Sequence, residues 1–218
     1  MLAAMTAVMA LTAAAAQPLP KREFRGAWIP TVGDRYYATH TTGQNKAYLL
    51  NMLDSIKATG CNVVIFHCRP QADAFYPSKL EPWSVWISGT PGVGPDPDWD
   101  PMEFMVEESH KRGMELHAWI NPYRVGYPRQ IADSSLCRRH PEWFLEYAGQ
   151  TYFDPAYPEC RDHINGVVRD IVARYDIDAI HMDDFFYPYP KDGLEFPDTA
   201  SYNRFGIGWE RGDWRRHN

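Results

Sequence analysis

Polar side chains recur at alternate positions where three apolar segments of the chain end. They are His67 and Arg69 in the first segment, His117 and Asn121 in the second, with Trp119 between them, and His181 and Asp183 in the third. Alternate side chains of a strand point to the same face. Burying an unpaired polar group costs about 1–3 kcal/mol, so such groups at equivalent strand ends indicate a functional site.

Two adjacent carboxylates make the third strand end the strongest candidate for catalysis. Asp183 and Asp184 follow the apolar segment and precede an aromatic run that includes Tyr187. The alternation places Asp183 on the same face as His181, which makes it the preferred reacting carboxylate. Asp184 fits a catalytic role, and it fits equally well a helix N-cap or a salt-bridge partner.

Other roles remain open for the same residues. Each histidine, taken alone, also fits a core or rim position with its hydrogen bonds satisfied. Together, His67, His117, His181 and Asp183 fit the zinc ligands of a metal-dependent barrel hydrolase or deacetylase, because histidine and carboxylate at strand ends suit that metal. A chain that binds a ligand at this site without performing chemistry is a further hypothesis.

Strand-like and helix-like segments alternate along the chain, which predicts an α/β fold with a parallel sheet. The expected strands are 24–30, 61–68, 114–121 and 177–184, and the expected helices are 44–58, 101–112 and 161–175. The carboxyl ends of parallel strands share one edge, where α/β proteins bind their ligands. The candidate residues lie at this edge.

Two connections that follow strand ends, 70–99 and 122–159, are longer than the roughly 12–15 residues beyond which a loop is usually functional or disordered. Both are rich in aromatic residues. They contain Tyr76, Trp83, Trp86 and Trp99 in the first connection and Tyr123, Arg124, Tyr127, Trp143 and Phe144 in the second. Aromatic faces and hydrogen-bonding groups around a cleft form a ligand site that suits sugar rings, although loop packing also explains part of this set.

Composition excludes several classes of protein. The chain has 218 residues, of which 44% are hydrophobic and 23% charged, with a formal net charge of -6 and no Lys/Arg-rich run. A packed core is therefore expected, and neither a nucleic-acid partner nor a polybasic membrane patch is supported. No apolar run reaches the roughly 18–20 residues of a spanning helix, which excludes a multi-span membrane protein.

The N-terminus and the cysteines bear on localisation. Residues 1–16 are uncharged and rich in Ala, Met and Leu, which favours an export signal and a periplasmic or extracellular protein, although the positive n-region is missing. Cys61 and Cys68 bracket a predicted strand and are expected to be core thiols. Cys137 and Cys160 lie in one predicted loop, and their spacing leaves open whether they pair. No cysteine spacing indicates a structural zinc site.

Six blocks of the sequence, in this order, resemble the glycosyl-hydrolase-like family 10, formerly domain of unknown function 187. The blocks are EFRGAWIPT, NVVIFHCRPQADAFYPSKLEPWS, MELHAWINPYR, HPEWF, TYFDPAYPECRDHI and DAIHMDDFFYPYP. The resemblance covers 23–218 and implies a TIM-barrel-like domain, a bacterial exported protein, and hydrolysis of a glycosidic bond in peptidoglycan-type glycan without a cofactor.

The resemblance also carries over site residues position by position. The family's strand-end residues fall on Arg69, Asp73, Asn121, Tyr123, Arg124, Asp183 and Asp184. By analogy with retaining barrels of the α-amylase type, Asp183 is the expected nucleophile, and the acid is expected on the strand that follows. We expect Arg69, Asp73, His117, Trp119, Asn121, Tyr123, Arg124, His181 and Tyr187 to bind the substrate.

The length of the chain limits how much of a (β/α)8 barrel it can form. Four strands correspond to about the first four βα units of a (β/α)8 barrel, which typically takes about 250 residues. Only 34 residues follow Asp184, and their last stretch, GWERGDWRRHN, has the pattern of the opening of a helix. The domain 23–218 is therefore expected to be a barrel truncated at its C-terminus. Alone it is expected to bind glycan, or to misfold, rather than to turn substrate over.

Overall fold

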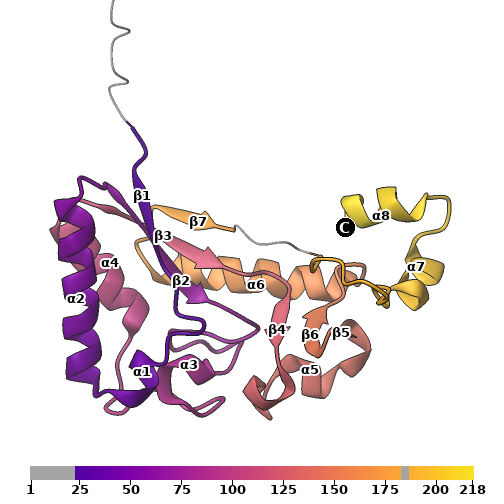
Figure 1. Ribbon diagram of the computed structural model, residues 1–218, viewed down its shortest axis with the longest axis horizontal. Coiled ribbons are helices and arrows are strands. Elements are labelled where there is room, and N and C mark those ends of the chain that lie inside the picture. Colours follow the sequence, from indigo (N-terminus) through magenta and orange to yellow (C-terminus); the bar gives the residue numbers. More distant parts are fainter. Residues whose placement is uncertain (1–22, 183–186) are drawn as a thin grey trace, which may run out of the picture.

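The computed structural model describes residues 23–182 and 187–218, and its centre is a four-stranded parallel sheet (Figure 1). The strands, in spatial order, are β1 (Gly26–Ile29), β2 (Val63–Arg69), β3 (Glu115–Ile120) and β7 (Ala179–His181). All three neighbouring pairs are parallel. The sequence prediction of an α/β fold with a parallel sheet is confirmed.

Three helices connect these strands and cover one face of the sheet (Figure 1). They are α2 (Thr42–Ala58), α4 (Pro101–Lys111) and α6 (Pro158–Arg174). The covered face carries alternate strand residues, because side chains of a strand alternate between faces. On β3, for example, Leu116 and Ala118 are buried in the helix-covered core, whereas His117 and Trp119 alternate with them, point to the opposite face and are half-buried.

Polar caps fix where these helices begin. Thr41 and Gln44 form a reciprocal capping box at the start of α2, which satisfies two otherwise unpaired donors. Asp100 caps α4 by accepting from the backbone N–H groups of Met102 and Glu103 at 3.0 and 3.2 Å. Its second carboxylate oxygen accepts from the hydroxyl of Tyr175 at 2.7 Å. One carboxylate therefore joins the start of α4 to the end of α6.

The connection 122–159 contains a small antiparallel sheet that the sequence analysis treated as loop. Its strands are β4 (Arg124–Gly126), β5 (Phe144–Tyr147) and β6 (Gln150–Phe153), in the order β4-β6-β5. Strands of three or four residues are too short to show a period in the sequence. The β5–β6 turn has positive φ at Ala148 and Gly149, as two-residue hairpins require.

Short helices complete the connections and the C-terminal part. They are α1 (Tyr36–Thr39) after β1, α3 (Val85–Ser88) after β2, the 3-10 turns η1 (Pro128–Gln130) and η2 (Pro141–Trp143) with α5 (Leu136–Arg139) between them, and α7 (Thr199–Phe205) and α8 (Arg211–His217). The last helix occupies the segment whose pattern predicted one. Asp198 is buried at its interface with α7 and pairs with Arg211 and Arg215.

The cysteines are all free, including Cys137 and Cys160. Cys68 is a buried core thiol, as expected, whereas Cys61 is only half-buried. The expectation for Cys61 was wrong because β2 begins two residues after it, which leaves this side chain outside the strand's core face. In the described part of the chain, no helix combines the length and apolarity needed to cross a membrane.

Replacing Asp100 with alanine should lower the free energy of unfolding by about 1–2 kcal/mol, the upper range for loss of an N-cap, because the Tyr175 hydroxyl also loses its acceptor. Urea unfolding followed by circular dichroism measures the change. Asp98→Ala is the matched control, since this exposed aspartate lies two residues before the cap. Equal stability of the two variants would contradict the capping role.

Candidate functional site

The candidate site lies at the carboxyl edge of the parallel sheet. β2 ends at Arg69, β3 at Ile120 and β7 at His181, and their parallel pairing brings these ends to one edge. The face opposite the helices is concave. The indole nitrogen of Trp28 lies 3.3 Å from Nε2 of His181, although β2 and β3 separate their strands. With neighbouring strands about 4.8 Å apart, this contact requires the sheet to curve toward that face.

A row of three ring side chains crosses this concave face. In the register of the sheet, His67 of β2 lies beside Trp119 of β3, and Trp119 lies beside His181 of β7. The rings of His67 and Trp119 stack, with centroids 3.6 Å apart and planes 8° apart. The structure thus brings together the predicted residues Trp119 and His181 on one face. His117 lies one row earlier, in register with Ile65 and Ala179.

His67 is held neutral by its surroundings. Burial lowers the pKa of His67 to about 3, and the positive charges of Arg124 and Arg69 act in the same direction. Both ring nitrogens are buried without a hydrogen-bond partner, as is the indole nitrogen of Trp119. An imidazole in this state adds no positive charge to the site, and it fixes the indole of Trp119 through the stack.

Arg69 is fully buried, and its guanidinium is directed at protein groups. Its Nε and one terminal nitrogen donate to the two carboxylate oxygens of Glu81 at 2.7 and 2.5 Å. The other terminal nitrogen donates to the carbonyls of Asn121 and Pro122. The guanidinium therefore joins the end of β2 to the end of β3. The prediction that it contacts substrate stays a prediction.

Glu81 has a second partner on α6, where Nε2 of His163 lies 2.9 Å from Oε1. Burial alone would raise the pKa of Glu81, but Arg69 and His163 hold it below its ordinary value. Glu81 and His163 escaped the sequence analysis because they lie 82 positions apart and in no motif that pairs them. Both lie within the sequence blocks that carry the family resemblance, and that is the signal that could have found them.

Asp73 lies buried beside this ion pair. Burial raises the pKa of Asp73 to about 7, and the negative charge of Glu81 adds to the shift, against a hydrogen bond with Ser84 and the charge of Arg69. Its Oδ1 has no hydrogen-bond partner. A carboxyl group with this pKa can hold or release a proton near neutral pH. The predicted substrate contact of Asp73 stays a prediction.

Asn121 turns the chain at the end of β3. Its side-chain oxygen accepts from the backbone N–H of Arg124 at 2.9 Å, and the residue is buried. Tyr123 and Arg124 are half-buried, and burial raises the pKa of Tyr123. The backbone carbonyl of Tyr123 accepts from Phe153 at 2.8 Å, which attaches the small antiparallel sheet to this edge.

The remaining predicted residues lie at different distances from this edge. His117 is in the next row of the concave face, where its ring lies 5.6 Å from that of Phe24 and its Nε2 lies 3.3 Å from a carboxylate oxygen of Glu115. Tyr187 packs against Phe196, and burial raises the pKa of Tyr187 to about 12. The catalytic candidates Asp183 and Asp184 lie outside the described residues.

The described residues include no group of three or more His, Cys, Asp or Glu side chains arranged to hold a metal ion. The histidines of the zinc hypothesis have separate partners: His67 stacks on Trp119, His117 contacts Glu115, and His181 contacts Trp28. The fourth proposed ligand, Asp183, is outside the described residues.

Glu81→Gln should lower the free energy of unfolding by about 3–5 kcal/mol, because it leaves the guanidinium of Arg69 buried without a counter-charge. Urea denaturation measures the loss. Glu107→Gln is the matched control, since Glu107 is 58% exposed and only pairs with Lys111, and surface pairs contribute about 0–1 kcal/mol. A loss as small as in the control would show that the buried pair does not stabilise this edge.

Asp73→Asn should stabilise the chain increasingly as the pH rises from about 4 to about 7. In this window the unfolded chain, with an ordinary pKa of 3.8, has released the proton that the folded chain still holds, since the folded pKa is about 7. The wild type therefore loses stability with rising pH, and the asparagine variant lacks this loss. Unfolding measured at several pH values checks it, and a pH-independent difference between the two proteins would contradict it.

The chain is similar to several known proteins. It is 41% identical over 206 residues to glycosyl hydrolase YngK of Bacillus subtilis, across 90% of this chain and 40% of that protein. It is 32% identical over 232 residues to glycosyl hydrolase DigH of Escherichia coli, across 96% of this chain and 51% of that protein. The chain thus spans about half the length, or less, of these curated relatives.

A solved structure shares the fold. α-L-Fucosidase isoenzyme 2 from Paenibacillus thiaminolyticus aligns with a TM-score of 0.52 and 14% identity, over 88% of this chain and 27% of that chain. The likeness concerns the fold alone.

The family described as glycosyl hydrolase-like 10 matches residues 23–218, which include every described element. With this match and the identity to YngK and DigH, the chain belongs to the glycosyl hydrolase-like 10 family.

Proposed function

We propose that the chain supplies the first four βα units, and one catalytic carboxylate, of an exported glycoside hydrolase that acts on peptidoglycan-type glycan. One observation carries the proposal. In a member of the glycosyl hydrolase-like 10 family, three adjacent parallel strands place His67, Trp119 and His181 in one row near their carboxyl ends. Active sites of (β/α)8 enzymes occupy this edge.

The concave face supports a barrel that further βα units close. Phe24 and Trp28 are 60% and 51% exposed, whereas the opposite face of the sheet is covered by helices. Large aromatic side chains bury about 150–250 Å² each when they pack. The curvature across β1 to β7 already brings Trp28 to His181. Both features fit the interior surface of a barrel.

The proposed chemistry uses two carboxyl groups. Glycoside hydrolysis requires one to protonate the leaving oxygen and another to act as nucleophile or to activate water. Asp183 follows His181 by two positions, which gives it the same face in a continuing strand. We assign it the nucleophile role and keep Asp184 as its alternative. The acid comes from the strand that follows in the whole protein.

The described residues supply binding and orientation in this proposal. Trp119 offers apolar surface to a sugar ring, and the neutral His67 fixes its indole. Asn121, Tyr123 and Arg124 follow the end of β3, where they can hydrogen-bond to hydroxyl groups. Arg69 and Glu81 hold the ends of β2 and β3 together, which keeps these groups in place.

The substrate and the localisation rest on different observations. The relatives DigH and YngK are named glycosyl hydrolases, and the resemblance of the six sequence blocks supports cell-envelope glycan. The uncharged, apolar segment 1–16 supports export.

Asp183→Asn should abolish release of reducing ends from purified peptidoglycan glycan strands by the product of the whole gene. The reason is that an amide can neither attack the anomeric carbon nor stabilise its developing charge. Asp192→Asn changes an exposed aspartate after the same strand and serves as the matched control with unchanged turnover. Turnover by the Asp183 variant equal to that of the control would overturn the assignment of Asp183.

A further inference from the structure

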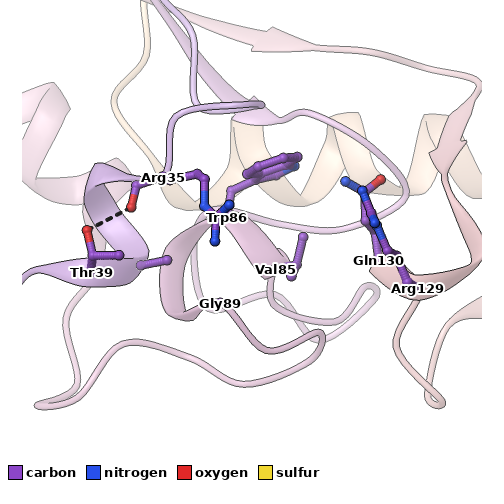
Figure 2. A pocket seen from close by; sticks show the side chains of 8 residues that line it. Arg35, Thr39, Val85, Trp86, Gly89, Arg129 and Gln130 are labelled. Carbon is purple, nitrogen blue, oxygen red and sulfur yellow. Dashed lines mark hydrogen bonds between the residues drawn. The ribbon is translucent and has the colours of Figure 1, made fainter.

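A cavity of about 460 Å³ lies beyond the carboxyl ends of the strands, between α1, α3 and η1. This volume falls within the range of small-molecule sites, about 300–1,000 Å³. Figure 2 shows Trp86 of α3 between Arg35 on one side and Arg129 with Gln130 on the other. The three elements follow β1, β2 and the β3–β4 segment respectively, and α1 and α3 are labelled in Figure 1. The cavity that they line therefore lies beyond the carboxyl edge that carries the candidate site.

The two arginines that line the cavity have no acidic partner among the residues that the structure describes. The chain carries more acidic than basic side chains, 28 against 22. Even so, the guanidinium groups of Arg35 and Arg129 make no hydrogen bond or ion pair with any described residue. Asp34, next to Arg35, is used elsewhere, by the backbone N–H of Tyr36 and the hydroxyl of Tyr48. Two such cations at one cavity favour an anionic ligand.

The wall between the arginines is both apolar and polar. Val85 and Ala38 contribute apolar surface. The indole nitrogen of Trp86 donates to Gln71 at 3.1 Å, and Gln71 donates to Gln130 at 3.2 Å. Gln71 is buried and lies two residues after the end of β2. These hydrogen bonds therefore fix the position of the cavity wall relative to the end of β2, where the candidate site lies.

The hydrogen bonds between Trp86, Gln71 and Gln130 depend on a glycine packed against them. Gly126 ends β4 with φ of 114°, and a Cβ placed there would lie 2.1 Å from Nε2 of Gln71. The glycine thus provides the space through which Gln71 reaches Gln130. The wall of Trp86, Gln71 and Gln130 is therefore held in place, which reduces the ordering cost of binding against it, whereas the exposed Arg35 and Arg129 become ordered when the ligand binds.

We propose that this cavity is a subsite that binds a carboxylate-bearing sugar unit of the glycan. The inference rests on the proposed function and adds the place where the glycan's negative charge is recognised. The planar guanidinium groups of Arg35 and Arg129 hydrogen-bond to the carboxylate, because their fork of donors matches its two oxygens. Trp86 and Val85 contact the apolar face of the ring that carries it. A small inorganic anion would leave this apolar wall unused.

The test compares the affinity of two oligosaccharides that differ only in charge. One is a peptidoglycan-type tetrasaccharide with free carboxylates, and the other is the same tetrasaccharide with its carboxylates converted to methyl amides. Calorimetric titration uses the product of the whole gene with Asp183→Asn, so that the sugar is not consumed. The charged form should bind about tenfold more tightly or better, since hydrogen bonds to charged groups contribute about 1.5–3 kcal/mol and 1.4 kcal/mol is tenfold.

Combined Arg35→Gln and Arg129→Gln should bring this ratio of affinities to about one, because the charged tetrasaccharide loses far more affinity than the neutral one. Arg139→Gln is the matched control, because Arg139 is an exposed arginine of α5 outside the cavity lining, and it should keep the ratio.

Four outcomes would overturn the subsite. Equal binding of both sugars by the parent protein would remove it while leaving the proposed function standing. A ratio retained in the double variant would place carboxylate recognition elsewhere. If inorganic phosphate at the concentration of the sugar removes the difference in affinity between the two tetrasaccharides, the cavity is a general anion site. Binding of neither sugar would remove the subsite and the proposed function together.

Discussion

Neutralisation of the buried Arg69 guanidinium is the constraint around which the carboxyl edge of the sheet is arranged. A guanidinium inside a protein is tolerated only with its charge paired and its donors satisfied. Here Glu81 supplies the charge, and the carbonyls of Asn121 and Pro122 accept the remaining bonds. Glu81 comes from the first long connection, and its second partner, His163, comes from α6. The end of β2, the end of β3, a connecting segment and a helix thus meet at one ion pair.

Sheet curvature gives that edge its shape. Helices α2, α4 and α6 bury one face of the sheet, and the other face is concave enough for Trp28 of β1 to reach His181 of β7. The row of His67, Trp119 and His181 follows from register alone, because parallel neighbours in register present the same face. Beyond this row, the sequence reaches Asp183 after two residues. The row therefore ends two positions before the proposed nucleophile in the sequence.

The sequence predicted the elements with a strong period and missed those whose contacts are distant. Helices α2, α4 and α6 and the buried strand β2 lie close to their predicted bounds, because apolar spacing and end signals such as Asp100 and Gly60 are local. The small antiparallel sheet has strands too short for a period. The partnership of Glu81 and His163, and the cavity wall formed by Gln71 and Gln130, depend on tertiary packing that no local pattern encodes.

The central claim is that glycan binds at the carboxyl edge of β2, β3 and β7, in a barrel that this chain begins. A crystal structure of the product of the whole gene with a bound peptidoglycan-type oligosaccharide tests it most directly. The account predicts a closed barrel, with a sugar ring in contact with Trp119 and its scissile bond next to Asp183. An oligosaccharide bound at the opposite, amino-terminal edge of the strands, or a sheet that stays open with Trp28 exposed, would contradict it.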